Sequence, residues 1–410
     1  MRLKEICDYI SRGVTPDYVD ESFYKVMNQA TFSKGWLDNS NVRYTSKCTK
    51  EAQIKKGDLL MASTGGGVLG KVFYYDSNDS CFYADSHVTI LRNSKGKNLM
   101  KYLYYYFSIK YDEINATMVK GSTNQTELQR NYLLAYELNM PSLDKQQQAV
   151  AYMDAKLATI NNRMEVLGKQ RDGYVRLKKS IIHQAVTRGL NPDARLKDSG
   201  IEWIGMIPEH WEVKRIKDIV SDIFMGTSPV YEYECDNYNF VFGQKNNQLY
   251  GIDFDDIKYA KDFFFKSRPK REFLRYGDVL LNTLGGGSVG RAGFYNKQDN
   301  VPVITDGHVM VIRSNFYNTK YMYYFLFSKR ERLELMATGS TNQAFFNISD
   351  IRIVPLPTPS LSEQQAIAQY LDAKCAQIDD TIENIEKQLD ALKRLKRALI
   401  NEVVTGKRKV

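Results

Sequence analysis

A glycine-rich run that ends in a cation is the first part of this sequence that could do chemistry. Residues 65–71 fit the pattern G-x-x-x-x-G-K, in which backbone amides can cradle a phosphate. Val72 stands where a nucleotide-binding loop needs Ser or Thr to hold magnesium, and in the related run 285–291 the lysine is replaced by Arg291. The pattern favours a turn between strands, or glycines that let backbone amides approach a DNA phosphate while Lys71 and Arg291 add charge.

Amide and hydroxyl side chains gather in a pentapeptide, Gly-Ser-Thr-Asn-Gln, that occurs at 121–125 and again at 339–343. Amides pair bidentately with adenine and hydroxyls suit phosphates, but the same residue types form turns and helix caps. Both interpretations stay open. The candidate DNA-binding residues combine these amides, the two cations and four residues beside the glycine runs that differ between the copies: Asn124, Gln125, Asn342, Gln343, Lys71, Arg291, Ser63, Thr64, Asn282 and Thr283.

Two Asp-x-His pairs could in principle supply a general base. They are Asp85 with His87 and Asp306 with His308, but no nucleophile recurs at a matching place. Each pair is therefore a turn that binds the backbone, or part of a DNA-binding surface. Residues 228–231 (Ser-Pro-Val-Tyr) approach the tetrapeptide with which amino-methyltransferases hold a flipped adenine, yet no strand leads into a cofactor-binding glycine turn. We expect no catalytic residue, no metal site and no cofactor on this chain.

The elements that must position these residues are repeated. Residues 57–71 return as 277–291, 220 positions later, and the agreement extends over much of the chain. Such a near-constant offset indicates duplication, so the sequence predicts two similar modules: module 1 (residues 1–141) and module 2 (residues 209–359). Two modules in one polypeptide suggest a pseudo-twofold molecule, and B-DNA is the commonest partner with a matching local twofold.

Each module mixes two kinds of pattern. Short alternating runs rich in β-branched or aromatic residues, such as 71–75 and 308–312, predict strands between glycine-rich turns. Aromatic runs at 102–107 and 321–326 predict helices or at least buried segments. The predicted fold class of each module is α+β.

A long amphipathic pattern follows each module. Apolar residues recur with a period near 3.5 over 150–185 and 371–403, which is typical of a coiled-coil seam. We therefore predict long helices over 142–189 and 360–410 that pair with one another in antiparallel fashion and separate the two modules. The polar segment 190–208, rich in turn residues, predicts a linker.

Composition limits the class of protein. The chain has 410 residues and a formal net charge of +9, which suits a polyanionic partner. The five cysteines are scattered without a CxxC pair, which favours a reducing cytoplasm and argues against a disulfide framework or structural zinc. No run approaches the ~18 apolar residues of a membrane span, so we expect a cytoplasmic protein with no membrane partner.

The order of these features resembles the specificity subunit of type I restriction-modification enzymes. The resemblance rests on the duplication, on the segment 200–211 (Gly-Ile-Glu-Trp-Ile-Gly-Met-Ile-Pro-Glu-His-Trp), on 353–357 (Ile-Val-Pro-Leu-Pro) and on Glu363-Gln364-Gln365 at the start of the second long helix. It covers nearly the whole chain. No single motif is specific, but their order and duplication are.

This resemblance implies a non-catalytic subunit whose modules are two target-recognition domains, each reading half of a split, asymmetric sequence in double-stranded DNA. The long helices would set the spacer between the halves and bind two modification subunits, which use S-adenosylmethionine to methylate adenine. Separate motor-nuclease (restriction) subunits, with ATP and magnesium, would cut unmodified DNA. S-adenosylmethionine, ATP and magnesium are thus expected on partner subunits only.

Two other functions are compatible with the residues alone. A coiled-coil scaffold could join proteins without touching DNA, and a salt-dependent gel shift would distinguish it, since phosphate contacts weaken steeply with salt. A self-sufficient nuclease or methyltransferase would form product from DNA, magnesium and S-adenosylmethionine, and we expect none.

Overall fold

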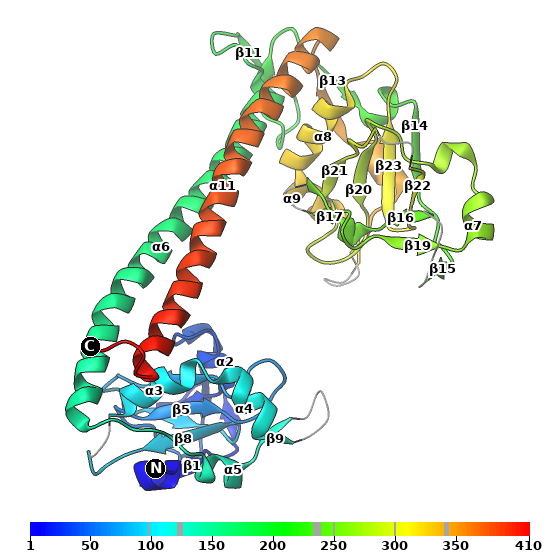
Figure 1. The fold of residues 1–410 in the computed structure, drawn as a ribbon. Helices are drawn as coiled ribbons and strands as arrows, with labels where there is room; N and C mark the ends of the chain where they lie inside the picture. The colour runs from blue at the N-terminus through cyan, green and yellow to red at the C-terminus, as the bar shows by residue number, and fades with distance from the viewer. Residues whose placement is uncertain (97–98, 121–125, 233–238, 249–250, 299–300, 340–343) are drawn as a thin grey trace. The chain divides into compact units, whose positions relative to one another are not determined.

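Two compact units make up the structure, a computed structural model. Unit 1 comprises residues 1–168 and 387–410, and unit 2 comprises residues 169–386. Each unit therefore holds one module and a part of each long helix (Figure 1). The residues that the structure describes are 1–96, 99–120, 126–232, 239–248, 251–298, 301–339 and 344–410.

Module 1 is built on two four-stranded sheets. The first has the order β1-β8-β5-β6 and is antiparallel throughout, with strands Tyr9–Arg12, Val88–Arg92, Leu59–Ala62 and Val72–Tyr74. The second has the order β2-β4-β3-β7, with strands Tyr18–Val19, Arg43–Thr45, Lys25–Met27 and Phe82–Ala84. In the second sheet β3 and β7 run parallel, which brings the ends of both strands to the same edge.

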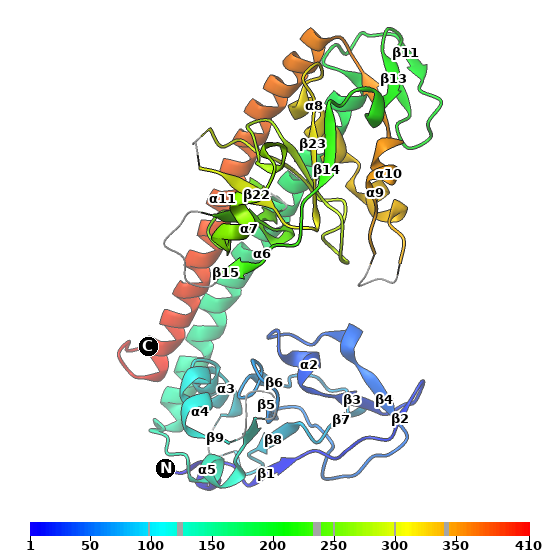
Figure 2. The ribbon, with the colours of Figure 1, turned by 90° about the vertical axis from the view of Figure 1, so that its right-hand side faces the viewer.

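The first sheet is buried on both faces. Leu59 and Met61 of β5 pack in the core under the helices, while Leu60 points to the opposite face and packs in the core shared with the second sheet. Successive side chains of a strand point to opposite faces, so a continuous apolar strand is the expected sequence for this position. Figure 2 shows α3 and α4 on one side of this sheet and the second sheet on the other.

Short helices and one further strand pair complete module 1. The helices are α1 (Leu3–Ile6), α2 (Gln29–Phe32), α3 (Met100–Ser108), α4 (Tyr111–Thr117) and α5 (Arg130–Ala135), with a 3₁₀ turn at Asn39–Asn41. β9 (Val119–Lys120) pairs with β10 (Glu127–Leu128). The aromatic run predicted as helical is therefore α3.

Module 2 repeats this architecture. Its first sheet has the order β14-β23-β20-β21, with strands Asp222–Met225, Val309–Arg313, Val279–Asn282 and Ala292–Phe294. Its second has the order β15-β19-β16-β22, with strands Tyr231–Glu232, Lys258–Ala260, Phe240–Phe242 and Val303–Thr305. The same parallel pair closes the second sheet, here β16 with β22. The α+β class predicted from the sequence is confirmed.

The helices and small sheets of module 2 follow the same plan. The helices are α7 (Asp262–Lys266), α8 (Thr319–Ser328), α9 (Arg330–Met336) and α10 (Ile348–Arg352), with 3₁₀ turns at Ile216–Asp218, Gln244–Asn246 and Lys270–Glu272. The paired strands are β17 (Asn247–Gln248) with β18 (Gly251–Ile252), and β13 (Glu212–Arg215) with β24 (Pro355–Thr358). The aromatic run predicted as helical is α8.

The segment predicted as a linker has structure of its own. Its two ends pair as β11 (Leu196–Asp198) and β12 (Met206–Pro208). Ile204 and Ile207 are buried in the main core of unit 2 together with Trp211. The polar composition indicated a connection, but these apolar residues pack it onto unit 2.

The two long helices are α6 (Leu143–Arg188) and α11 (Leu361–Val404). In unit 1 the beginning of α6 packs on the end of α11, through residues such as Met153 and Leu399 in one core cluster. In unit 2 the end of α6 packs on the beginning of α11, through residues such as Val186 and Leu371. The pairing is therefore antiparallel within each unit, as predicted for two amphipathic helices that bury their apolar stripes against each other. The compact units divide both helices, and the predicted domain boundaries stay predictions.

Each aromatic helix is fastened to both long helices by matching hydrogen bonds. In unit 1 the backbone N–H of Leu99 donates to Gln146 Oε1 at 2.9 Å, and the Tyr102 hydroxyl donates to the carbonyl oxygen of Val404 at 3.2 Å. In unit 2 the corresponding donors are Asn318, bonded to Gln364, and Tyr321, bonded to Val186 at 2.9 Å. Tyr102 thus satisfies a carbonyl at the end of a helix that begins in the other unit, and so does Tyr321.

Candidate functional site

An aspartate marks the same place in both modules, buried in module 1 and half-buried in module 2. Asp85 follows β7 and Asp306 follows β22, each at the edge where the parallel strand pair ends. The backbone N–H of His87 donates to Asp85 Oδ1 at 2.8 Å, and that of His308 donates to Asp306 Oδ1 at 2.9 Å. Each Asp-x-His pair is therefore a backbone-binding turn, one of the two alternatives that the sequence left open.

A tyrosine lies near each aspartate, and a cation lies over the ring of each tyrosine. In module 1 the guanidinium carbon of Arg43 on β4 lies 5.2 Å from the ring centre of Tyr18 on β2. In module 2 the ammonium of Lys258 on β19 lies 4.6 Å from the ring centre of Tyr231 on β15. Both pairs are at cation–π distance, which fixes the cations close to the sheet edge.

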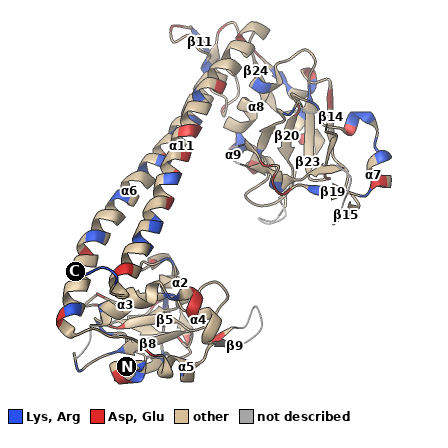
Figure 3. Cartoon of the chain, in the orientation of Figure 1, with Lys and Arg blue, Asp and Glu red and all other residues tan. Residues whose placement is uncertain are grey.

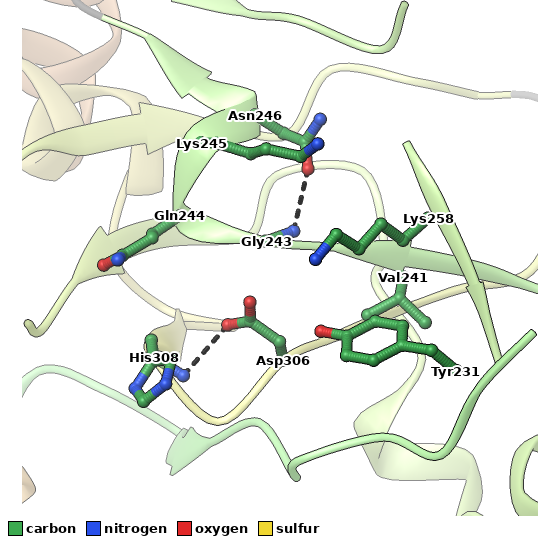
Figure 4. Close-up of a pocket in the computed structure, with 9 residues that line it drawn as sticks. All are labelled: Tyr231, Val241, Gly243, Gln244, Lys245, Asn246, Lys258, Asp306 and His308. Carbon is green, nitrogen blue, oxygen red and sulfur yellow. Dashed lines mark hydrogen bonds between the residues drawn. The ribbon is translucent and has the colours of Figure 1, made fainter. Parts of the chain in front are cut away.

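In module 2 these groups line a cavity of about 360 Å³. Asp306 and Tyr231 lie on one side and Gly243 on the other, and Lys258 reaches between them (Figure 4). The residues that line the cavity are Tyr231, Val241, Gly243, Gln244, Lys245, Asn246, Lys258, Asp306 and His308.

Burial sets the ionisation of the cavity. It raises the pKa of Asp306 above its ordinary value, while the backbone N–H of His308 and the nearby charges of His308 and Lys258 act in the opposite direction. Burial, and then the charge of Asp306, also raise the pKa of Tyr231. The Tyr231 hydroxyl consequently keeps its proton, and the carboxylate of Asp306 is an acceptor held at an energetic cost.

Gly243 keeps the cavity open. A Cβ atom at this position would lie 2.8 Å from Asp306 Oδ2, closer than real Cβ contacts come. The backbone N–H of Gly243 instead donates to Asn246 Oδ1 at 2.9 Å. A side chain here would have to displace the carboxylate of Asp306, whereas the backbone of Gly243 has ordinary extended angles and does not itself require glycine.

Module 1 carries Asn28 at the position of Gly243. Asn28 Oδ1 accepts hydrogen bonds from the backbone N–H groups of Ala30 and Thr31, and so caps α2. The next residue, Gln29, accepts a hydrogen bond from Thr64 Oγ1 at 3.2 Å, and Thr64 Oγ1 also lies 2.8 Å from His87 Nδ1. The polar groups of module 1 are therefore bonded to one another at the place where module 2 has its cavity.

The glycine runs are loops of the first sheet in both modules. Residues 65–71 join β5 to β6, and residues 285–291 join β20 to β21. Gly70 and Gly290 have positive φ values of 84° and 75°, and a Cβ on either would lie within about 3 Å of Ile114 or Leu333 side-chain atoms. Lys71 is half-buried at the end of its loop. The interpretation as a turn between strands is confirmed, and a phosphate contact by Lys71 stays a prediction.

Several predicted DNA-binding residues lie inside module 2. Asn282 is 0% exposed, and its amide donates to the carbonyl oxygen of Gln244 at 2.9 Å. Thr283 is buried and donates to the carbonyl oxygen of His308. The guanidinium of Arg291 donates to the carbonyl oxygens of Asn247 and Gly287, both at 3.0 Å. These three side chains stabilise the loop 285–291, because their polar groups form hydrogen bonds to other residues of module 2.

The remaining predicted residues divide into two groups. Ser63 is 0% exposed and its hydroxyl lies 2.5 Å from that of Thr89, so it too faces the interior, whereas Thr64 is half-buried beside His87. Asn124, Gln125, Asn342 and Gln343 lie outside the described residues. Contact of any of these residues with DNA stays a prediction.

Sequence reasoning missed the tyrosine, the cation and the glutamine of the site. Tyr231 ends the tetrapeptide 228–231 and Tyr18 ends its counterpart, residues 15–18, but the repeat indicates a shared turn and assigns neither tyrosine to a site. Arg43 and Lys258 are equivalent only through their strand register, opposite Val26 and Val241 respectively, and their spacing differs from the 220-residue offset. That equivalence needed the structure.

Two kinds of feature are absent from the described residues. Over the part of the chain that the structure describes, no group of three or more His, Cys, Asp or Glu side chains could hold a metal ion. In the same residues no helix is long and apolar enough to span a membrane. In each module, the tyrosine, the cation and the aspartate place hydrogen-bonding and cationic groups at the edge of the second sheet.

The model of the type I restriction modification DNA specificity domain matches residues 1–166 and again 208–394. The chain belongs to this family. It is a type I restriction-modification specificity subunit, and the family resemblance seen in the sequence is confirmed.

Relatives of this specificity subunit align over its full length. The putative MjaX specificity subunit of Methanocaldococcus jannaschii is 26% identical and covers 100% of this chain and 93% of its own. The MjaVIII specificity subunit of the same organism is 24% identical, with 100% and 92% covered. A chain from a structure on complex assembly and conformational transition of the type I R-M system has a TM-score of 0.69 at 17% identity, covering 98% of this chain and 96% of its own, which supports the fold.

Proposed function

We propose that each module reads one half of a split, asymmetric target in double-stranded DNA, and that the chain itself catalyses no reaction. The duplicated cluster carries the proposal: Tyr18, Arg43 and Asp85 in module 1, and Tyr231, Lys258 and Asp306 in module 2. A cation beside hydrogen-bonding groups is suited to phosphates and base edges. Because the groups around the two aspartates differ, the two half-sites differ.

The long helices are proposed to dock two modification subunits. Exposed apolar side chains on α6 support this, since Val166 is 47% exposed and Leu177 is 46% exposed. On α11, Leu395 is 53% exposed. These side chains are spread along the helices, and a partner subunit that covered them would remove their apolar surface from water. Lys and Arg are also placed along both helices (Figure 3).

The division of labour follows from this proposal. S-adenosylmethionine would be bound by the modification subunits, and ATP and magnesium by the restriction subunits that join through the complex. The complex would work in the cytoplasm, where the DNA is. The alternative of a scaffold that does not touch DNA is disfavoured by the family's DNA-specificity domains.

The experiment that tests the proposal is to co-express the chain with a type I modification subunit that forms a complex with it and to map methylated adenines across the host DNA. We expect a split motif with an unread gap, and exchange of module 2 for that of another specificity subunit should change one half only. The purified chain alone, incubated with DNA, magnesium and S-adenosylmethionine, should form no product. A stable complex that methylates a continuous motif, or none, would overturn the two-reader proposal.

The role of the helices in setting the spacer has its own test. Seven residues added to both α6 and α11 in matching register would lengthen the pair by ~10 Å, or about three base pairs. We expect the unread gap to grow by about that number. An unchanged gap in methylation mapping would contradict the role of the helices while leaving the two-reader proposal intact.

A further inference from the structure

The cavity of module 2 combines an acceptor at its floor with cations at its rim. Asp306 is half-buried and faces Gly243, while Lys245 and Lys258 are exposed. Lys245 is held by an ion pair with Asp256. A polyanion can approach the rim, but a phosphate would be repelled from the floor because the carboxylate of Asp306 is there.

One residue that lines the cavity also has an unpaired hydrogen-bond acceptor. Gln244 Oε1 is buried and, among the described residues, has no hydrogen-bond partner. Its counterpart in module 1, Gln29, receives a hydrogen bond from Thr64, and module 2 has Leu284 at the position of Thr64. An unpaired buried oxygen is costly and uncommon. Gln244 lines the cavity, although its amide points away from Asp306 (Figure 4), so Asp306 is the acceptor that faces the open space.

We propose that this cavity is the base-reading site of module 2, and that Asp306 accepts a hydrogen bond from the exocyclic amino group of a target base, N4 of cytosine or N6 of adenine. The proposal rests on the proposed function and deepens it. In the major groove only these two groups are donors, and a carboxylate pairs with the amino group of cytosine in the same way. Lys258 stands beside the floor to contact the acceptor of a neighbouring base or a phosphate.

The surroundings of the cavity fit duplex DNA. β19, which carries Lys258, leads directly into α7 and the turn after it, where Lys266, Lys270 and Arg271 are exposed (Figure 3). Cations beside a site of base contact position the backbone and supply most of the salt-dependent affinity. In this arrangement Asp306 at the floor of the cavity contacts the base, and the basic residues beside the cavity bind the DNA backbone.

The test uses the complex with its modification subunit and two matched variants, Asp306→Asn and Asp85→Asn. Asp306→Asn removes the carboxylate but keeps the shape of the side chain. We expect methylation mapping to show relaxed or altered identity at one position of one half-site only. Asp85→Asn, the same change in module 1, should leave that half-site as it is.

Base analogues identify the group that is read. At the affected position, purine replaces adenine or pyrimidin-2-one replaces cytosine, so that the amino group alone is lost. We expect the wild-type complex to bind the analogue roughly 5- to 100-fold more weakly, the range for one base contact, and the Asp306→Asn complex to show no such loss. Which analogue has the effect tells adenine from cytosine.

The outcomes separate the two proposals. If the wild-type complex gives no split motif, the proposed function fails. If it does, but Asp306→Asn leaves both the motif and the analogue penalty unchanged, the base-reading site is wrong. Should Asp306→Asn fail to fold, Lys258→Gln replaces it, because Lys258 is exposed: we expect weaker binding of the target, and unchanged affinity with an unchanged motif would equally overturn the proposal.

Discussion

Module 1 places an amide side chain where module 2 has only the backbone of Gly243. Asn28 caps α2, and Gln29, Thr64 and His87 are joined by hydrogen bonds. In module 2 the same positions leave a cavity beside Asp306 and an unpaired Gln244 oxygen. The two copies have the same sheets but different side-chain hydrogen bonds at one sheet edge. The fold can therefore stay the same while the polar groups presented at that edge change.

A second difference lies just behind the first. In module 1, Phe32 stacks on Phe73 at a ring-centre distance of 5.9 Å. In module 2 the equivalent pair is Asn247 and Gly293, where a Cβ on the glycine would lie 2.4 Å from Asn247 Oδ1. Asn247 in turn donates to Asn282 at 3.1 Å. One copy supports the loop with an aromatic pair and the other with buried amides.

The largest expected effect on stability comes from removing an aspartate–arginine ion pair that both modules have. Asp278 forms two hydrogen bonds, of 2.6 and 2.8 Å, to the guanidinium of Arg313, and both side chains are buried. Asp278→Ala leaves a buried unpaired cation, so we expect the free energy of unfolding of unit 2 to fall by about 3–5 kcal/mol. Denaturant unfolding, monitored by hydrogen exchange of the residues of unit 2, measures this free energy.

The matched change is Asp58→Ala in module 1, where Asp58 pairs with Arg92 in the same way. We expect a similar loss there, in unit 1. Asp390→Ala, which removes an exposed ion pair with Lys393, should cost less than about 1 kcal/mol. A loss at Asp278 no larger than the loss at Asp390 would contradict the shared structural role.

The next change converts module 2 toward module 1. Gly243→Asn introduces side-chain atoms within 2.8 Å of Asp306 Oδ2, so we expect a loss of roughly 1–3 kcal/mol in the stability of unit 2, typical of overpacking. The side chain should also fill the cavity and alter one half of the methylated motif. Asn28→Gly is the reverse change, and it should cost only a few tenths of a kcal/mol at the cap of α2. If Gly243→Asn is neutral for both stability and motif, the cavity has no role in either.

The elements were largely predictable and the site was not. The 3.5-residue period gave α6 and α11, because burying a stripe along a helix constrains every third or fourth residue. The choice of Asn282 and Thr283 as DNA contacts relied on their difference from Ala62 and Ser63. Asn282 differs because it bonds to Asn247, a packing change that a single sequence cannot distinguish from a change in readout.

A smaller effect is expected where module 2 lacks a hydrogen bond that module 1 has. Leu284→Thr would place a hydroxyl beside Gln244 Oε1, as Thr64 does for Gln29. Leu284→Val is the control, since valine has the shape of threonine without the hydroxyl. We expect the threonine variant to be more stable than the valine variant by about 1 kcal/mol, the net value of one hydrogen bond. Equal stabilities in denaturant unfolding would mean that Gln244 is satisfied in some other way.

The smallest effect is a pH dependence that separates Asp306 from an ordinary structural aspartate. Burial raises its folded-state pKa, so the folded state holds the proton more tightly than the unfolded chain, whose Asp pKa is about 3.9. Stability from this group is present below that value and is lost as pH rises through the folded-state pKa. His308, Lys258 and Tyr231 face the same carboxyl, and the positive charges reduce the shift.

Asp306→Asn lacks this titration, so its stability relative to wild type should increase as the pH rises from about 4. Thermal unfolding of the full chain measures this difference. An Asp306→Asn variant that becomes less stable relative to wild type over that range would show that the carboxylate is stabilised by its surroundings, and the argument for a carboxylate held at a cost beside the open cavity would fail.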